Sequence, residues 1–269
     1  MIESRPCEIR VGTSGYDYPE WKASFYPPDL SRKNFLSFYA ERFNTVELNF
    51  SYYGMPRAEQ LSRLLEASGA RCLLSIKGNR SFTHEIDPAS WRESLGQYRA
   101  ALEPLLSSGR LGAVLLEFPP SFAYEPERRR YLDELLRELG GLPVVAEFRN
   151  IAWYNNRVFD ALRERGVGLA SMDVPELPGL PPAVDLVTSP VGYIRFHGRN
   201  AGTWRSGDAA TRYDYLYSPE ELGSWVERVK SIASKAALLL IYFNNHFRGQ
   251  AAQNAAMLKE LLADSGASP

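Results

Sequence analysis

The chain has 269 residues, 45% of them hydrophobic, and its 31 basic residues almost balance its 32 acidic ones. This length suits one domain with one large core, and a net charge of −1 excludes a global field that would draw the protein onto nucleic acid or an anionic membrane. Cys7 and Cys72 lie in apolar stretches and make no disulfide framework, and neither a secretory leader nor a run of roughly 20 apolar residues is evident, so we expect a cytoplasmic protein with no membrane partner.

Short apolar runs rich in β-branched residues recur along the whole chain, and each is a candidate strand. Several are apolar on both faces, which is typical of strands buried between an inner core and outer helices. Eight such strands are predicted, at residues 9–14, 45–52, 71–77, 112–118, 143–149, 166–173, 192–197 and 237–245.

Stretches with helical spacing or helix-start signals separate these strands. One start is Ser218-Pro219-Glu220-Glu221, which offers a hydroxyl cap, a proline in the first turn and acids that suit the helix dipole. Residues 174–190 carry many prolines and no helical period, so we expect an irregular loop there, and we expect the tail to fray after about residue 263. Helices are predicted at residues 33–42, 58–68, 91–107, 127–139, 158–165, 219–234 and 249–263.

The alternation of strands and helices predicts the fold. It indicates a single (β/α)8 barrel of the TIM type over residues 1–269, with a closed parallel sheet of eight strands. Enzymes with this fold build their sites at the carboxyl ends of the strands.

Polar residues gather near those carboxyl ends. Side chains two apart share a face of a strand, so the inward-pointing polar groups can be read from the alternation. A buried charge costs several kcal/mol unless it is paired, and this favours a functional site over a scaffold role for the whole set. Glu147 with Arg149 alone fits a structural ion pair equally well. The residues predicted to point inward are Glu47, Asn49, Ser75, Lys77, Glu117, Glu147, Arg149, Ser171, Asp173, Arg195, His197, Tyr242 and Asn244.

Ordered motifs along nearly the whole chain resemble the YecE-like family, also called domain of unknown function 72. They include Val-Gly-Thr-Ser-Gly-Tyr at 11–16, Phe-Asn-Thr-Val-Glu-Leu-Asn at 43–49, Glu-Phe-Arg at 147–149, Arg-Phe-His-Gly at 195–198 and Tyr-Phe-Asn-Asn at 242–245. The resemblance implies a TIM-type barrel and brings no established reaction. The family usually has Gln, His and Asp where this chain has Glu117, Asn150 and His246, which implies that these three have no shared catalytic role.

The mixture of cations, acids and histidines favours an enzyme acting on a small anionic substrate, phosphorylated or carboxylated, by general acid/base chemistry. Arg149 and Arg195 would clamp the anion, His84 or His197 would transfer protons, and Lys77 would stabilise developing negative charge. No cofactor is assigned. The predicted catalytic residues are Lys77, His84, Glu147, Asp173 and His197, and the predicted substrate-binding residues are Glu47, Asn49, Arg149, Arg195, Tyr242, Asn244 and Trp204.

Two other chemistries use the same strand ends. The chain has three histidines, too few for a histidine-rich zinc cluster, so a metal-dependent phosphodiesterase would need one hard cation held by Glu47, Glu147 and Asp173, with His197 as an optional fourth ligand. A glycosidase needs two carboxyl groups flanking the bond, and strand seven supplies Arg195 and His197 in place of a second acid.

A non-enzymatic alternative rests on the segment after strand seven. Trp204 lies there among Arg199, Arg205 and Arg212, a combination that suits nucleic acid or a phosphate-bearing ligand in an open groove. The glycine-rich part of this segment, residues 198–207, is a candidate lid over the barrel mouth.

Overall fold

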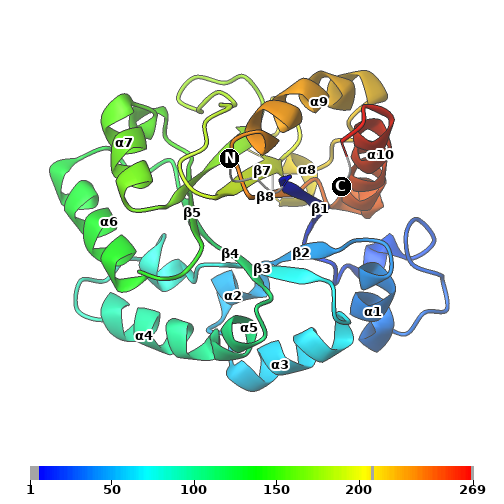
Figure 1. Ribbon diagram of the computed structural model, residues 1–269, viewed down its shortest axis with the longest axis horizontal. Coiled ribbons are helices and arrows are strands. Elements are labelled where there is room, and N and C mark those ends of the chain that lie inside the picture. Colours follow the sequence, from blue (N-terminus) through cyan, green and yellow to red (C-terminus); the bar gives the residue numbers. More distant parts are fainter. Residues whose placement is uncertain (1–5, 207–208, 268–269) are drawn as a thin grey trace.

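The eight predicted strands close into a parallel barrel in the computed structural model, which describes residues 6–206 and 209–267 (Figure 1). Each strand pairs with the next along the chain, and β8 returns to pair with β1. The prediction of a single-domain α/β barrel of the TIM type is therefore confirmed. The strands are β1 (Glu8–Ser14), β2 (Thr45–Leu48), β3 (Leu73–Lys77), β4 (Leu111–Phe118), β5 (Val144–Phe148), β6 (Gly168–Asp173), β7 (Val191–Phe196) and β8 (Leu238–Phe243).

Helices form the outer layer around this barrel (Figure 1). The hydroxyl cap predicted at the start of α9 is present and is part of a capping box, in which the Ser218 hydroxyl accepts from the Glu221 backbone and the Glu221 carboxylate accepts from the Ser218 backbone. The α-helices are α1 (Phe35–Ala40), α2 (Phe50–Tyr53), α3 (Ala58–Ala67), α4 (Trp91–Ala101), α5 (Glu103–Ser107), α6 (Pro126–Glu138), α7 (Asn156–Glu164), α8 (Ala209–Arg212), α9 (Pro219–Ala233) and α10 (Gln250–Asp264). Short 3-10 helices are η1 (Pro19–Trp21), η2 (Arg32–Asn34), η3 (Arg80–Phe82), η4 (Ile151–Trp153) and η5 (Phe247–Gly249).

Most element boundaries differ from the sequence prediction by one to a few residues, and three of the differences have a clear structural reason. The second strand ends at Leu48, because the chain turns at Asn49 directly into α2. The single helix predicted over 91–107 is two helices, since Pro104 has no N–H to continue the first one. The tail does not fray directly after residue 263, because Ala267 N–H donates to the Leu262 carbonyl at 3.0 Å and closes the end of α10, while residues 268–269 lie outside the described part.

The connection between β6 and β7 is irregular, as predicted, and residues 174–190 contain neither helix nor strand. No helix in the described part of the chain is long and apolar enough to cross a membrane.

Two layers of side chains fill the barrel. The lower layer is mainly apolar and comprises Ala113, Leu115, Val145, Ala170, Tyr193, Leu240 and Tyr242. The Tyr242 hydroxyl lies 2.5 Å from the Thr45 hydroxyl and 2.9 Å from the Ser75 hydroxyl. One step nearer the carboxyl ends, the inward positions of β2, β4, β5 and β7 are occupied by Glu47, Glu117, Glu147 and Arg195.

Gly198 follows β7 and His197, and it allows a test of the backbone conformation at the carboxyl end of this strand. Its φ is +86°, and a Cβ placed on it would lie 2.7 Å from the Tyr215 Cβ. We expect Gly198→Ala to lower the free energy of unfolding by about 2 kcal/mol or more, measured by urea denaturation. The matched control is Gly223→Ala, in the middle of α9 with no atom within 4 Å of the added methyl group, which should raise stability by up to about 1 kcal/mol. Equal effects of the two substitutions would contradict the strain argument.

Candidate functional site

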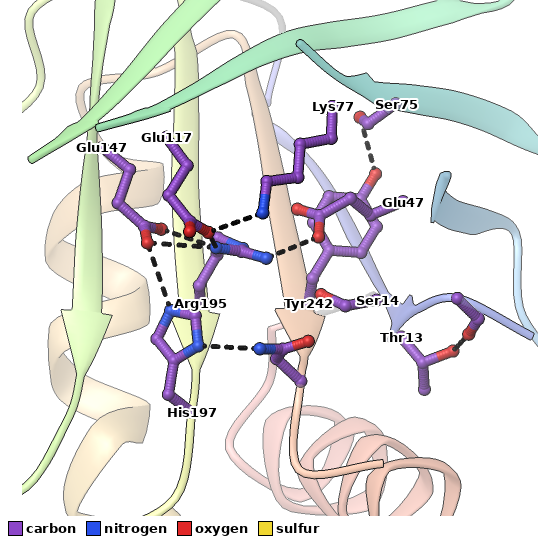
Figure 2. Close-up of polar contacts among 12 residues, drawn as sticks. Thr13, Ser14, Glu47, Ser75, Lys77, Glu117, Glu147, Arg195, His197 and Tyr242 are labelled. Carbon is purple, nitrogen blue, oxygen red and sulfur yellow. Dashed lines mark hydrogen bonds and ion pairs between the residues drawn. The ribbon is translucent and has the colours of Figure 1, made fainter. Parts of the chain in front are cut away.

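A buried guanidinium surrounded by three carboxylates lies at the carboxyl ends of the strands (Figure 2). Arg195 Nη1 donates to Glu117 Oε2 at 2.9 Å and to both Glu147 oxygens at 3.0 Å. Its Nη2 donates to Glu47 Oε1 at 2.7 Å, and the other oxygen of Glu47 accepts from the Tyr193 hydroxyl at 2.7 Å. Four strands are thereby joined through one side chain.

Two further cations balance the charge of this cluster. Lys77 Nζ lies 3.2 Å from Glu117 Oε2, and Arg149 Nε lies 2.6 Å from Glu147 Oε1. Burial alone would raise the pKa of Glu117, but the charges of Lys77, Arg149 and Arg195 more than offset burial and hold that pKa well below its usual range. The pKa of Glu147 is lowered in the same way by Arg149 and Arg195. Three acidic and three basic side chains therefore form one cluster with no net formal charge, which we call the Arg195 cluster.

His197 is a buried neutral ring beside this cluster. Asn244 Nδ2 donates to its Nδ1 at 3.0 Å, and its Nε2 lies 3.5 Å from Glu147 Oε1, so the Nε2–H tautomer satisfies both contacts. Burial first, and then the positive charge of Arg149, lower the pKa of His197 to about 3. The ring is therefore uncharged at neutral pH and both of its nitrogens are engaged.

Above the Arg195 cluster lies a cavity of about 580 Å³. Arg149 and Glu117 belong to both, because their side chains extend from the cluster into the cavity wall. Trp204 is only 7% exposed and lies under this wall, with the Arg149 guanidinium 5.9 Å from its ring centre. The lining consists of His84, Glu117, Pro119, Pro120, Arg149, Asn150, Pro178, Gly179, Leu180, Trp204, Arg205, Arg212 and Tyr213.

His84 presents a free nitrogen in this cavity. Thr83 Oγ1 donates its proton to the Asn79 carbonyl at 3.0 Å, so it can only accept from His84 Nδ1, which lies 3.0 Å away. The neutral ring therefore carries its proton on Nδ1, and Nε2 keeps its lone pair. Burial lowers the pKa of His84 below its usual 6.5, which keeps this lone pair available at neutral pH. Tyr52 links His84 to Lys77, with the His84 ring centre 4.9 Å and the Lys77 Nζ 4.3 Å from its ring centre.

The structure brings most of the predicted site residues to one end of the barrel, at two depths. Lys77, His84, Arg149 and Trp204 lie in or beside the cavity. Asn49 lies at the end of β2, and its Oδ1 is buried without a hydrogen-bond partner among the described residues. The remaining inward residues are covered, and these are Glu47, Glu147, Arg195, His197, Tyr242 and Asn244. Tyr242 is the deepest and belongs to the apolar layer.

Asp173 is a correction, because it points away from the barrel interior. The interior position of β6 is taken by Ala170, and Asp173 shares the outer face with Ser171. Its carboxylate accepts from the Arg199 guanidinium at 2.6 and 2.9 Å, and from the Tyr217 hydroxyl and the Trp225 indole at 2.7 and 2.8 Å. The residue anchors the segment after β7 against α9.

The positions of these side chains also argue against the two alternatives drawn from the sequence, the hard-cation site and the nucleic-acid groove, because the residues of each do not come together. The hard-cation set does not converge, since Arg195 stands between Glu47 and Glu147, and Asp173 faces outward. Among the described residues, no group of three or more His, Cys, Asp or Glu side chains is placed to hold a metal ion. The nucleic-acid groove is divided, because Arg199 lines a neighbouring cavity with Asp173 while Trp204 and Arg205 line the site. Of the proposed lid, residues 198–206 are described and Gly207 lies outside the described part.

The sequence prediction was incomplete at this site. The alternation along β4 correctly placed Glu117 inward, but the family resemblance implied no catalytic role for it and it was left out of the predicted site, where the structure makes it central. Tyr213 lines the cavity from the loop before α9, where no periodicity marks it.

Removing the central cation tests the cohesion of the Arg195 cluster. Arg195→Met leaves three buried carboxylates without their shared donor, and we expect it to lower the free energy of unfolding by about 3–5 kcal/mol in urea denaturation. The control is Arg163→Met, which breaks an exposed pair with Asp160 and should cost less than about 1 kcal/mol. Similar losses in both variants would contradict a cohesive role for Arg195.

His197 predicts how stability depends on pH. Its pKa is about 3 in the folded protein and about 6.5 unfolded, so the unfolded state binds more protons between these values. Stability is therefore complete above pH 6.5 and is lost as the pH falls, by up to about 1.4 kcal/mol per pH unit from this residue. We expect His197→Gln to flatten the slope of unfolding free energy between pH 6.5 and 4.5, and the half-buried His84→Gln to flatten it less. An unchanged slope in His197→Gln would show that the ring is protonated in the folded state.

Comparison with known proteins agrees with the motifs. The family model described as "Protein of unknown function DUF72" matches residues 10–269. A DUF72 family protein from Thermotoga maritima is 33% identical with a TM-score of 0.87, over 95% of this chain and 99% of that chain. One from Enterococcus faecalis is 26% identical with a TM-score of 0.85, over 95% of each chain. UPF0759 protein YunF of Bacillus subtilis (strain 168) is 27% identical over 94% of both chains. The chain therefore belongs to the DUF72 family.

Proposed function

We propose that the protein is an enzyme that acts on a small anionic substrate, phosphorylated or carboxylated, by general acid/base chemistry in the cavity above the Arg195 cluster. The observation that carries this proposal is the charge of the lining. Its described residues include three arginines, Arg149, Arg205 and Arg212, and one acid, Glu117. A cavity of about 580 Å³ lies within the usual range for small-molecule sites of roughly 300–1,000 Å³, and its excess positive charge favours an anion.

Arg149 is the anchor for the anion. Its Nε lies 2.6 Å from Glu147 Oε1 and its Nη2 lies 3.5 Å from Glu117 Oε2, so two carboxylates restrain the guanidinium before a ligand arrives. Its Nη1 donates no hydrogen bond among the described residues. A fixed guanidinium with an unused donor is suited to bind a carboxylate or phosphate oxygen with little loss of conformational entropy.

His84 is the proton acceptor in this proposal. His84 lines the cavity, its Nε2 has no hydrogen-bond partner among the described residues, and its lowered pKa keeps the ring neutral at pH 7. Lys77, which contacts the same Tyr52 ring, stabilises the negative charge that develops on the substrate when the proton leaves. The reaction class that follows is proton abstraction from an anionic substrate.

His197 and Glu147 take positioning roles. His197 is 0% exposed and neutral, with Arg149 Nη2 at 3.2 and 3.4 Å from its two nitrogens. The single lone pair of the Nε2–H tautomer, on Nδ1, already accepts from Asn244, so His197 contacts the Arg149 cation without serving as a free base. Glu147 holds Arg149 and His197 together. Both residues therefore act through Arg149.

Turnover of a metabolite mixture tests the proposal. The protein is incubated with a cell extract freed of macromolecules, and depletion of anionic metabolites is followed by mass spectrometry. We expect the wild-type protein to deplete at least one anion, and His84→Gln to slow that depletion by about 10²–10⁴-fold while ligand binding, measured by calorimetry, persists. Arg149→Gln should instead weaken binding by about tenfold or more.

Arg163→Gln, on the outer surface of α7, is the matched arginine control and should change neither quantity. Depletion that is equally fast in His84→Gln would remove His84 as the base. Anion affinity that is unchanged in Arg149→Gln would overturn the proposed site.

A further inference from the structure

We infer that the substrate is a hydroxylated anion, in which a hydroxyl group lies next to the carboxylate or phosphate. This inference rests on the proposed function and deepens it. It comes from two atoms of cavity-lining side chains that have no hydrogen-bond partner among the described residues, Oε1 of Glu117 and Nη1 of Arg149.

Glu117 uses only one of its carboxylate oxygens inside the protein. Lys77 Nζ, Arg149 Nη2 and Arg195 Nη1 all contact Oε2, at 3.2, 3.5 and 2.9 Å (Figure 2 shows the contacts with Lys77 and Arg195). Oε1 accepts no hydrogen bond among the described residues. Because Glu117 lines the cavity and is held ionised by its neighbours, Oε1 is an acceptor that awaits a donor from a ligand.

The unused donor lies on the neighbouring residue. Arg149 Nη1 has no hydrogen-bond acceptor among the described residues, and the contact between Arg149 Nη2 and Glu117 Oε2 keeps both side chains on one wall. A ligand that contacts both must accept at one point and donate at an adjacent point. An anion with a neighbouring hydroxyl does this, since its charged oxygen accepts from Nη1 and its hydroxyl donates to Oε1.

The charge around Glu117 selects a hydroxyl over an amine as this donor. An ammonium group at Oε1 would add a fourth cation to a carboxylate that Lys77, Arg149 and Arg195 already contact, and would give the neutral Arg195 cluster a net positive charge. A neutral hydroxyl donates to the carboxylate without meeting this repulsion. An anion with no donor at all leaves Oε1 desolvated and unpaired, which is the situation that binding sites discriminate against most strongly.

Matched ligand pairs test the inference by calorimetry. Malate is compared with succinate, and glycerol 3-phosphate with propyl phosphate, so that each pair differs in hydroxylation and the two pairs differ in the anion. We expect the wild-type protein to bind the hydroxylated member of at least one pair about tenfold more tightly or better. Aspartate, with an ammonium group in place of the malate hydroxyl, should bind more weakly than malate.

Glu117→Gln gives the second arm of the test. The substitution keeps the shape and removes the negative charge, so succinate and propyl phosphate should bind more tightly while the preference for the hydroxylated member falls to about threefold or less. A thermal unfolding curve establishes whether the variant is folded. If it is not, the affinity ratios of the wild-type protein for the matched ligands decide whether the site prefers a hydroxylated anion.

The two proposals fail in different ways. Equal affinity of the wild-type protein for both members of each pair would overturn the hydroxyl inference and leave the anion site in place. No measurable binding of any of these anions, or binding that Arg149→Gln leaves unchanged, would overturn the proposed function itself.

Discussion

The interaction on which the rest of this structure depends is that of Arg195 with Glu47, Glu117 and Glu147 in the upper layer of the barrel. A barrel can be closed with Val and Leu, and a buried ion pair is often no more stable than apolar side chains of the same volume. The charged layer is therefore poorly explained by stability alone. The distinctive property of this layer is its fixed geometry, because the Arg195 guanidinium on β7 binds carboxylates at the ends of three other strands, β2, β4 and β5.

The consequences of this layer extend upward to the cavity. Glu147, held by Arg195, orients Arg149 and lies beside the His197 ring, so a residue with no exposed surface determines how Arg149 meets the cavity. The cluster as a whole is neutral, whereas Arg205 adds a positive charge at the rim of the cavity. In the proposed function, attraction of the anion and recognition of its shape would therefore depend on different parts of the same wall.

The barrel and most of the inner layer could be predicted from the sequence, because period-two alternation fixes which side chains share a face. The same rule failed at Asp173, where polar character was taken to mean an inward direction. On β6 the outer face also offers polar partners, the Trp225 indole and the Tyr217 hydroxyl, which satisfy a buried carboxylate as well as the interior would. Tyr213 and the wall near Pro178 were beyond prediction, since loop residues follow no period and reach the cavity through tertiary contacts.

The contrast between His84 and His197 shows why residue type alone does not assign a catalytic role. Burial is the main reason that the pKa of each ring is lowered and that both rings are neutral. Both nitrogens of His197 are in contact with a neighbour, Nδ1 with Asn244 and Nε2 with Glu147. In His84 the Thr83 hydroxyl keeps the proton on Nδ1, and Nε2 has no hydrogen-bond partner among the described residues. A general base needs a lone pair that a substrate can reach, and only one of the two rings has it. The capacity for proton transfer is therefore set by the neighbours of each ring, which lie on β5 and directly after β8 for His197 and in the turn after η3 for His84.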